Sequence, residues 1–315
     1  MDTTVSLGTF PTPLEPAPRL AAALGLEQDR LWIKRDDLTG LGGGGNKVRK
    51  LERMVATALR DGADSLITTG AAQSNHARLT AAAGARAGLP VTLVLAGEPS
   101  PPAGNLLLDG LFGARIRWAG ERGPGGLATF ADEVAAELTS AGGRPAVIPF
   151  GGSNRDGAAA YADAARELRG QVPADAVSVV ALGSGGTMAG LVAGLGAPHV
   201  LGVHVGAVPE PAAVVAGLAG AITAEPVSAG SLRVRTDQVG AGYSTLTSQS
   251  AEAVRLAART EGIVLDPVYT GRAMAGLTAA VRDGGIGPDT PVVFWHTGGL
   301  PGLFGHRDAA SLAGQ

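Results

Sequence analysis

The stretch Val177-Ser178-Val179-Val180-Ala181-Leu182 leads directly into Gly183-Ser184-Gly185-Gly186-Thr187, and apolar residues continue to Gly196. A short run that is apolar on both faces predicts a strand buried on both sides. The glycines interrupt the run, so 177–196 predicts a buried strand, a tight turn and a helix rather than a membrane span. This succession is typical of α/β folds.

The same alternation extends over most of the chain. Further strand-like runs occupy 66–69, 91–95, 146–148 and 292–295. Helical patterns occupy 48–59, closed by Asp61-Gly62, and also 132–141, 158–168 and 250–261. Strands that alternate with helices predict parallel sheets covered by helices and joined by right-handed crossovers.

Two glycine-rich turns, at 42–45 and 151–154, bracket about a third of the chain. The bracketed part has strands and helices of its own, and such turns are natural boundaries. We therefore predict a small α/β domain over 48–150, inserted into a larger domain made of 1–47 and 151–315.

The composition excludes several classes of function. The 315 residues carry a formal net charge of −3 and no cysteine. They therefore offer no footprint for nucleic acid or an anionic membrane, and no thiolate nucleophile. The five histidines form no H-x-x-x-H pair, so we expect no metal site. Since Met1-Asp2-Thr3-Thr4 shows no basic and then apolar leader, we expect no signal peptide and a cytoplasmic protein.

A lysine stands behind a glycine run in Gly42-Gly43-Gly44-Gly45-Asn46-Lys47, where a helical pattern begins. An amine at a helix N-terminus has a lowered pKa, which favours its reactive neutral form. It could form an imine with pyridoxal phosphate (PLP). A surface lysine would give the same pattern, whereas a Walker A loop would need Gly-Lys followed by Ser or Thr. Lys50, one turn on, would either add positive charge near a phosphate or face solvent.

The Gly183–Thr187 loop provides backbone N–H groups and a following helix, which together suit a phosphate. A dinucleotide-binding turn is the alternative, but it needs an acidic residue about twenty positions later. His204 lies near that point, and Glu210 falls in a Pro-rich turn. An amine and a phosphate cradle on one chain predict a PLP enzyme with Lys47 as the Schiff-base lysine.

Three further segments have polar groups in places that suit a ligand. Gln73-Ser74-Asn75-His76 opens an Ala-rich helix, where it could bind an α-carboxylate or cap the helix through Ser74 or Asn75. Tyr243 and Tyr269 lie in Gly- or Pro-containing turns, where they would either face a pocket or pack as ordinary aromatic side chains. Thr297, in His296-Thr297-Gly298-Gly299, follows the last strand, at a ligand site or a structural turn.

Together with Lys34-Arg35-Asp36-Asp37 and Asp266-Pro267-Val268-Tyr269, these segments resemble the PLP-dependent β-family (fold type II) over about 12–305. Within it they are most similar to the D-cysteine desulfhydrase and 1-aminocyclopropane-1-carboxylate (ACC) deaminase group. The resemblance implies two domains, each with a mainly parallel sheet flanked by helices, the larger one binding PLP. It also implies a homodimer.

The resemblance assigns roles to individual residues. Lys47 would bind PLP, and Lys50 with Gly183, Ser184, Gly185, Gly186 and Thr187 would hold its phosphate. Asn75 would contact the ring near its 3′-oxygen, and Ser74 and His76 would help it hold the substrate carboxylate. Tyr243 and Tyr269 match the two active-site tyrosines, and Lys47, Ser74 and both tyrosines form the catalytic set.

Two positions distinguish the members of the group. Thr270 stands where ACC deaminases have Glu, and Thr297 where they have an apolar residue. A threonine can only hydrogen-bond the pyridine nitrogen, so the electron sink is weaker and suits a good leaving group such as thiolate. We therefore predict α,β-elimination of D-cysteine to pyruvate, sulfide and ammonia. L-Cysteate sulfo-lyase or ACC deaminase-like activity stays open on the same scaffold. A non-catalytic binding protein and a nucleotide-dependent oxidoreductase are the alternatives from other classes.

Overall fold

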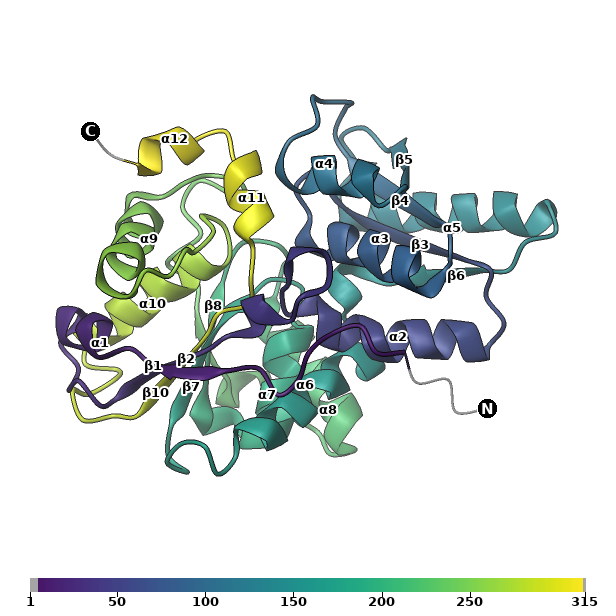
Figure 1. Ribbon diagram of the computed structural model, residues 1–315. Coiled ribbons are helices and arrows are strands. Elements are labelled where there is room, and N and C mark those ends of the chain that lie inside the picture. Colours follow the sequence, from purple (N-terminus) through teal and green to yellow (C-terminus); the bar gives the residue numbers. More distant parts are fainter. Residues whose placement is uncertain (1–4, 314–315) are drawn as a thin grey trace.

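The computed structural model describes residues 5–313 and has two open sheets, each with helices on both faces (Figure 1). The predicted α/β class is confirmed. Residues 1–4, where we expect no signal peptide, lie outside the described residues, as do 314–315; both belong to the predicted larger domain.

The larger sheet has the strand order β1-β2-β10-β7-β8-β9. Its strands are β1 (Leu14–Pro16), β2 (Leu31–Lys34), β7 (Val177–Leu182), β8 (Val200–His204), β9 (Arg233–Arg235) and β10 (Val292–Trp295). Only β1 runs antiparallel to its neighbour among the described strands. The parallel arrangement brings the carboxyl ends of β7, β8 and β10 to one edge, where ligands bind in such sheets.

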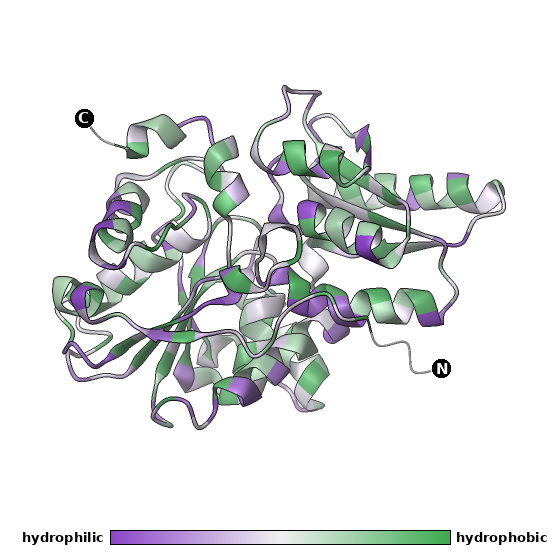
Figure 2. Cartoon of the chain, viewed as in Figure 1, coloured by the Kyte–Doolittle hydropathy of each residue, from purple (hydrophilic) through white to green (hydrophobic). Residues whose placement is uncertain are grey.

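Alternate side chains of these strands face two separate cores. Val179 packs with α1 (Pro18–Leu24), α9 (Ser248–Glu261) and α10 (Thr270–Arg282) on one face. Val180 packs with α6 (Arg155–Leu168), α7 (Gly186–Leu195) and α8 (Pro211–Thr223) on the other. This is why 177–182 is apolar at every position but Ser178, and Figure 2 shows the same hydrophobic strands between their helices.

The smaller sheet has the order β5-β4-β3-β6 with all strands parallel. Its strands are β3 (Ser65–Ala71), β4 (Val91–Ala96), β5 (Arg115–Trp118) and β6 (Pro145–Ile148). The helices α2 (Lys47–Arg60), α3 (Asn75–Ala87) and α4 (Gly104–Leu111) share one core with it. Helix α5 (Pro124–Ser140) covers the other face.

The strands predicted at 66–69, 91–95, 146–148, 177–182 and 292–295 are β3, β4, β6, β7 and β10. The four predicted helices are α2, α5, α6 and α9, but α5 begins at Pro124, before the predicted 132. Its first turns are helical because Leu127 and Ala131 are buried in the core beneath the sheet. None of the described helices is long and apolar enough to cross a membrane.

The strands of the smaller sheet all fall within 48–150, and those described for the larger sheet fall outside it. Leu7 and Leu41 nevertheless pack into the core of the smaller sheet, although both precede residue 48. Helix α2 contacts both α3 and α6 and so connects the two halves. The domain boundaries themselves stay a prediction.

Candidate active site

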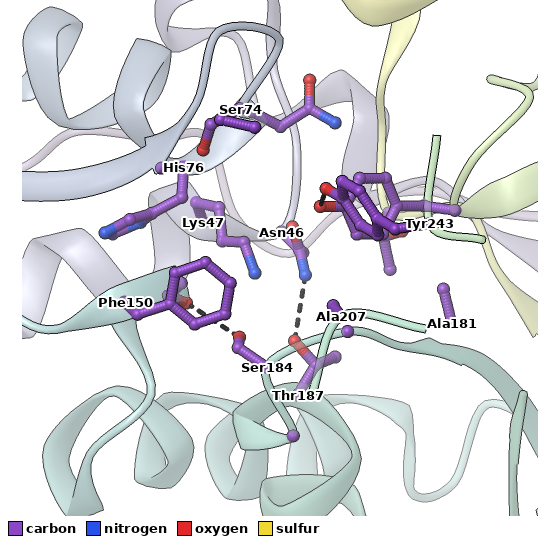
Figure 3. Close-up of a pocket in the computed structure, with 18 of the residues that line it drawn as sticks. Asn46, Lys47, Ser74, His76, Phe150, Ala181, Ser184, Thr187, Ala207 and Tyr243 are labelled. Carbon is purple, nitrogen blue, oxygen red and sulfur yellow. Dashed lines mark hydrogen bonds between the residues drawn. The ribbon is translucent and has the colours of Figure 1, made fainter. Parts of the chain in front are cut away.

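A cavity of about 250 Å³ receives residues from both halves of the molecule (Figure 3). Its walls include the start of α2, the loop after β3 and the loop after β7. The sequence-predicted residues that line it are Lys47, Ser74, Asn75, His76, Gly183, Ser184, Gly185, Thr187, Tyr243, Tyr269 and Thr297. Residues far apart in the chain are thus brought to one site.

Lys47 is the first residue of α2 and extends into the cavity, towards the loop that carries Ser184 and Thr187 (Figure 3). The preceding glycines shape this entry: Gly44 has φ +70°, and a Cβ there would lie 1.9 Å from Asp37 O. Burial lowers the pKa of the Lys47 amine to about 8, against an opposing hydrogen bond from Lys50. A lowered pKa was also predicted from the sequence, on the basis of the helix dipole. In the structure, burial is the main cause of the lowered pKa.

An anion cradle faces Lys47 at the N-terminus of α7. Ser153 Oγ accepts from Gly186 N (3.2 Å) and from Lys50 Nζ (3.2 Å), and it lies 2.8 Å from Ser184 Oγ. Lys50 and Gly186 are buried behind the surface of the cavity, and a Cβ on Gly186 would lie 2.8 Å from Lys50 Nζ. Only a glycine lets the backbone N–H groups and the amine come this close together.

The amines of Lys47 and Lys50 need a negatively charged partner when they are protonated. Burial and the neighbouring Lys47 lower the pKa of Lys50 well below its ordinary value. Neither amine has a carboxylate within salt-bridge distance among residues 5–313. A phosphate at the cradle would supply the missing charge, so the residues present fit PLP.

Ser153 is a site residue that the sequence analysis assigned only to a turn between domains. A glycine-rich turn before a helix was the available signal, since Gly151-Gly152-Ser153-Asn154 precedes α6 much as the Gly183 loop precedes α7. Phe150, Gly206 and Ala207 also line the cavity and were not predicted.

The start of α3 brings Ser74, Asn75 and His76 to the cavity. Ser74 is also the N-cap, because its hydroxyl accepts from Ala77 N at 3.1 Å. His76 Nε2 lies 2.9 Å from Thr68 Oγ1. Burial, with Lys47 and Lys50 close by, lowers the pKa of His76 well below its ordinary value, so the ring is neutral.

Tyr243 and Tyr269 form a pair at the other side of the cavity. Their rings meet edge to face at 5.9 Å, and their hydroxyls are hydrogen-bonded to each other. Burial raises the pKa of Tyr243 to about 12 and that of Tyr269 well above its ordinary value. Both hydroxyls therefore keep their protons at neutral pH and serve as hydrogen-bond donors.

The two threonines that the sequence analysis assigned to the cofactor differ in position. Thr297 follows β10 and lines the cavity, where its carbonyl accepts from Asn46 N at 3.0 Å. Thr270 is fully buried away from the cavity. Its hydroxyl donates to Asp266 Oδ1 (2.7 Å) and accepts from Asp266 N (2.8 Å). The assignment of Thr270 to the cofactor is therefore corrected: the turn that begins α10 directs its side chain to Asp266.

Over residues 5–313, no group of three or more His, Cys, Asp or Glu side chains could hold a metal ion. The chemistry that the cavity offers comes from one amine, an anion cradle, uncharged hydroxyl, amide and imidazole groups, and the exposed guanidinium of Arg122. That combination suits a carbonyl-bearing phosphate ester bound through Lys47.

Comparisons with known proteins agree with this geometry. The sequence pattern of the family described as "Pyridoxal-phosphate dependent enzyme" matches residues 5–298. A D-cysteine desulfhydrase of Klebsiella pneumoniae subsp. pneumoniae is 42% identical over 314 residues, which cover 94% of this chain and 94% of the relative.

Solved structures show the same relationship. The crystal structure of an ACC deaminase homologue matches with a TM-score of 0.89 and 37% identity, covering 98% of this chain and 96% of the other. Threonine deaminase isoform 2 of Solanum lycopersicum matches with a TM-score of 0.70 and 19% identity, covering 100% and 91%, which supports the fold alone. The chain therefore belongs to the family of pyridoxal-phosphate dependent enzymes and has their fold type II architecture.

Proposed function

We propose that the protein is a lyase that catalyses α,β-elimination on a small amino acid, with D-cysteine as the leading substrate. The observation that carries the proposal is the Lys47 amine, whose pKa burial lowers to about 8 in a cavity with an anion cradle. The D-cysteine desulfhydrase at 42% identity supports the choice of substrate. Elimination from D-cysteine with uptake of water gives pyruvate, hydrogen sulfide and ammonia.

Lys47 holds PLP covalently, and Lys50, Ser153 and the Gly183–Thr187 loop hold its phosphate. Asn75 and Thr297, which both line the cavity, would contact the ring. When bound, PLP withdraws electrons from the substrate Cα and makes its C–H bond acidic.

The chain's own groups then move the protons. Lys47 Nζ, released when the substrate amine replaces it on the cofactor, would take the proton from Cα, which the lowered pKa of the free amine permits at neutral pH. Ser74, Asn75 and His76 hold the substrate carboxylate at the N-terminus of α3, where free N–H groups favour an anion. The protonated Tyr243–Tyr269 pair donates to the departing sulfur.

L-Cysteate is the second candidate substrate, and one residue favours it. Arg122 lines the cavity although much of its side chain is exposed, and its guanidinium stacks on Phe130 at 4.7 Å. A cation at that position would attract a sulfonate on Cβ more than a neutral thiol. A substitution Arg122→Ala would then weaken use of L-cysteate and leave D-cysteine turnover nearly unchanged.

A visible absorbance spectrum of the purified protein with PLP tests the cofactor and the substrate together. D-Cysteine, L-cysteine and L-cysteate are added in parallel, and pyruvate is measured. A band that changes with D-cysteine while pyruvate forms is the expected result. If the band responds only to another of the amino acids, that amino acid is the substrate. Full turnover by a Lys47→Ala variant would refute the mechanism.

The chain also allows the lysine to be identified directly. Lys34, Lys47 and Lys50 are its only lysines, and Lys34 is paired with Glu167. Reduction with borohydride fixes the cofactor on the amine that holds it, and mass spectrometry of the digested protein locates it. We expect the label on Lys47; a label on Lys50 would exchange the proposed roles.

A homodimer is part of the proposal. Exposed apolar side chains gather on the contacting helices α4 and α11 (Leu300–Gly305), with Leu111 and Phe304 each 71% exposed. Such a patch is typical of an interface. Sedimentation of the wild type as a dimer and of a Leu111→Glu variant as a monomer would support it, and a monomeric wild type would refute it. A cytoplasmic location stays a prediction that cell fractionation tests.

A further inference from the structure

Asn105, at the start of α4, is a fully buried amide that reaches the loop carrying the predicted site residues. Its Nδ2 group donates to Gln73 O at 2.9 Å and to Asn75 Oδ1 at 3.0 Å. The Gln73 side chain ties the same two segments together, since Oε1 accepts from Asn105 N (2.9 Å) and Nε2 donates to Ala103 O (3.0 Å).

This network fixes which way each amide faces. Gln73 O is a backbone carbonyl and can only accept, so the side of Asn105 that faces it must be Nδ2. The second hydrogen of Asn105 Nδ2 then requires an acceptor on Asn75. The Asn75 atom that faces Asn105 is therefore Oδ1. Asn75 is left with its Nδ2 group for the cavity that it lines.

The orientation is thus determined by a backbone atom rather than by the ligand. An isolated Asn at a cavity wall could present either its oxygen or its nitrogen, because the two ends have nearly the same shape. Asn105 Oδ1 is buried with no hydrogen-bond partner in the described part of the chain. A buried acceptor without a partner costs stability, so simple packing does not account for an amide at this position.

We propose that Asn105 is a positioning residue that holds Asn75 as a hydrogen-bond donor towards the ring oxygen of PLP. The inference rests on the proposed function, in which Asn75 contacts that ring. A donor stabilises the oxygen in its anionic form, whereas a rotated Asn75 would present an acceptor and repel it. Asn105 acts through Asn75 and does not itself line the cavity, as far as the described residues show.

The test is a double-mutant cycle on cofactor affinity, measured by titrating PLP into cofactor-free protein and following its visible band. Asn75→Leu and Asn105→Leu should each weaken affinity about tenfold, as loss of a hydrogen bond to a charged group does. The double variant should be no weaker than Asn75→Leu alone, because Asn105 works only through Asn75. The absorbance maximum should shift in the same direction in both single variants.

Gln73→Glu is the matched control. It removes the bond to Ala103 O and loosens the same loop, but it leaves the Asn105 Nδ2 bonds in place. We expect its affinity to stay within about twofold of the wild type. Asn105→Ser, which is smaller and keeps one donor, provides a second variant if Asn105→Leu does not fold, and it should weaken affinity less.

Wild-type affinity in a folded Asn105→Leu variant, or additive effects in the double variant, would overturn the inference. Wild-type affinity in Asn75→Leu would overturn it too. If borohydride reduction nevertheless fixes PLP on Lys47, the proposed function stays intact. A wild-type protein that forms no band with PLP would refute the proposed function itself.

Discussion

The Lys47 amine and the Lys50 amine lie in one buried site, where Lys47 lowers the affinity of Lys50 for a proton while a hydrogen bond from Lys50 acts in the opposite direction on Lys47. Burial is the larger cause for both, because a charged amine loses its hydration there. The ordinary pKa of a lysine would leave almost no neutral amine at pH 7. The local environment thus prepares Lys47 as a nucleophile before any ligand binds.

This environment predicts how cofactor binding depends on pH. The neutral amine is the reactive form, and its fraction rises as pH passes through the pKa of about 8. The rate at which cofactor-free protein combines with PLP should rise about tenfold from pH 7 to a plateau near pH 9. Stopped-flow absorbance measures it, with N-acetyllysine methyl ester as a control of ordinary pKa. A rate that still climbs steeply above pH 10 would contradict the lowered pKa.

Thr270 and Thr297 give a second prediction at this scale. Thr270→Val removes both hydroxyl bonds with the buried Asp266, so the free energy of unfolding should fall by about 1–3 kcal/mol. The spectrum of the bound cofactor should not change. Thr297→Val should show the reverse, with an altered spectrum and nearly unchanged stability. Urea unfolding and absorbance compare the two, and a spectral change in Thr270→Val alone would contradict these assignments.

These residues also show what the sequence could not reveal. Local patterns identified Lys47 and the Gly183 loop, because a glycine run before a helix has chemical meaning by itself. Ser153 and Asn105 contact their partners across 31 and 30 residues of chain, so only the fold makes them neighbours. Thr270 was misassigned because its side chain follows the backbone of the turn towards Asp266, and the sequence does not give that direction.

Among the elements, α2 positions the site, since it carries Lys47 and contacts helices of both halves of the molecule. A buried ionic network fixes it. Arg49 donates to Asp36 Oδ1 (3.0 Å) and to Glu167 Oε2 (2.8 Å), and Lys34 also pairs with Glu167. The Lys34-Arg35-Asp36-Asp37 motif therefore anchors the helix that carries Lys47.

Two arginines on α2 allow a matched test of this anchor. Arg49→Met removes the cationic partner of the fully buried Asp36, while Glu167 keeps Lys34, so it should destabilise by about 3–5 kcal/mol. Arg53→Met breaks a pair with Asp163 whose side chains are 43% and 38% exposed, and it should cost less than about 1 kcal/mol. Urea unfolding measures both. Equal losses for the two variants would show that the network does not anchor the helix.

Elements that are buried on both faces were the easiest to predict. β7 and β10 are fully buried, and their apolar runs are visible in the sequence. β1 and β9 have three residues each, and no position of either is buried. Such strands show no hydrophobic periodicity in the sequence, because their position in the sheet depends on pairing with β2 and β8.

At the scale of the whole molecule, the site lies where two separately packed halves meet. The predicted class and the succession of elements were enough to expect two sheets. They could not predict that Leu7 would pack against the smaller sheet, since the N-terminal segment has to cross from one core to the other. The smaller half also buries a carboxyl group, that of Asp109 in α4, which affects its stability.

Asp109 makes the stability of the molecule depend on pH. It is fully buried, and neither carboxyl oxygen has a hydrogen-bond partner within residues 5–313. Burial raises its pKa from 3.8 to about 7, although Arg78 opposes the change. Between about pH 4 and 7 the unfolded chain therefore releases this proton before the native protein does, so the contribution of Asp109 to stability is lost as pH rises through this range.

Asp109→Asn should remove this loss. Above pH 7 the variant should be more stable than the wild type by about 1–3 kcal/mol, because it no longer buries an unpaired charge. At pH 4 the two proteins should unfold nearly alike, since Asp109 is then protonated in the native state. Asp29→Asn, at a side chain 76% exposed, is the control and should leave the pH profile unchanged. Urea unfolding from pH 4 to 8 measures the difference, and a wild-type advantage that grows with pH would mean that Arg78 keeps Asp109 ionised throughout.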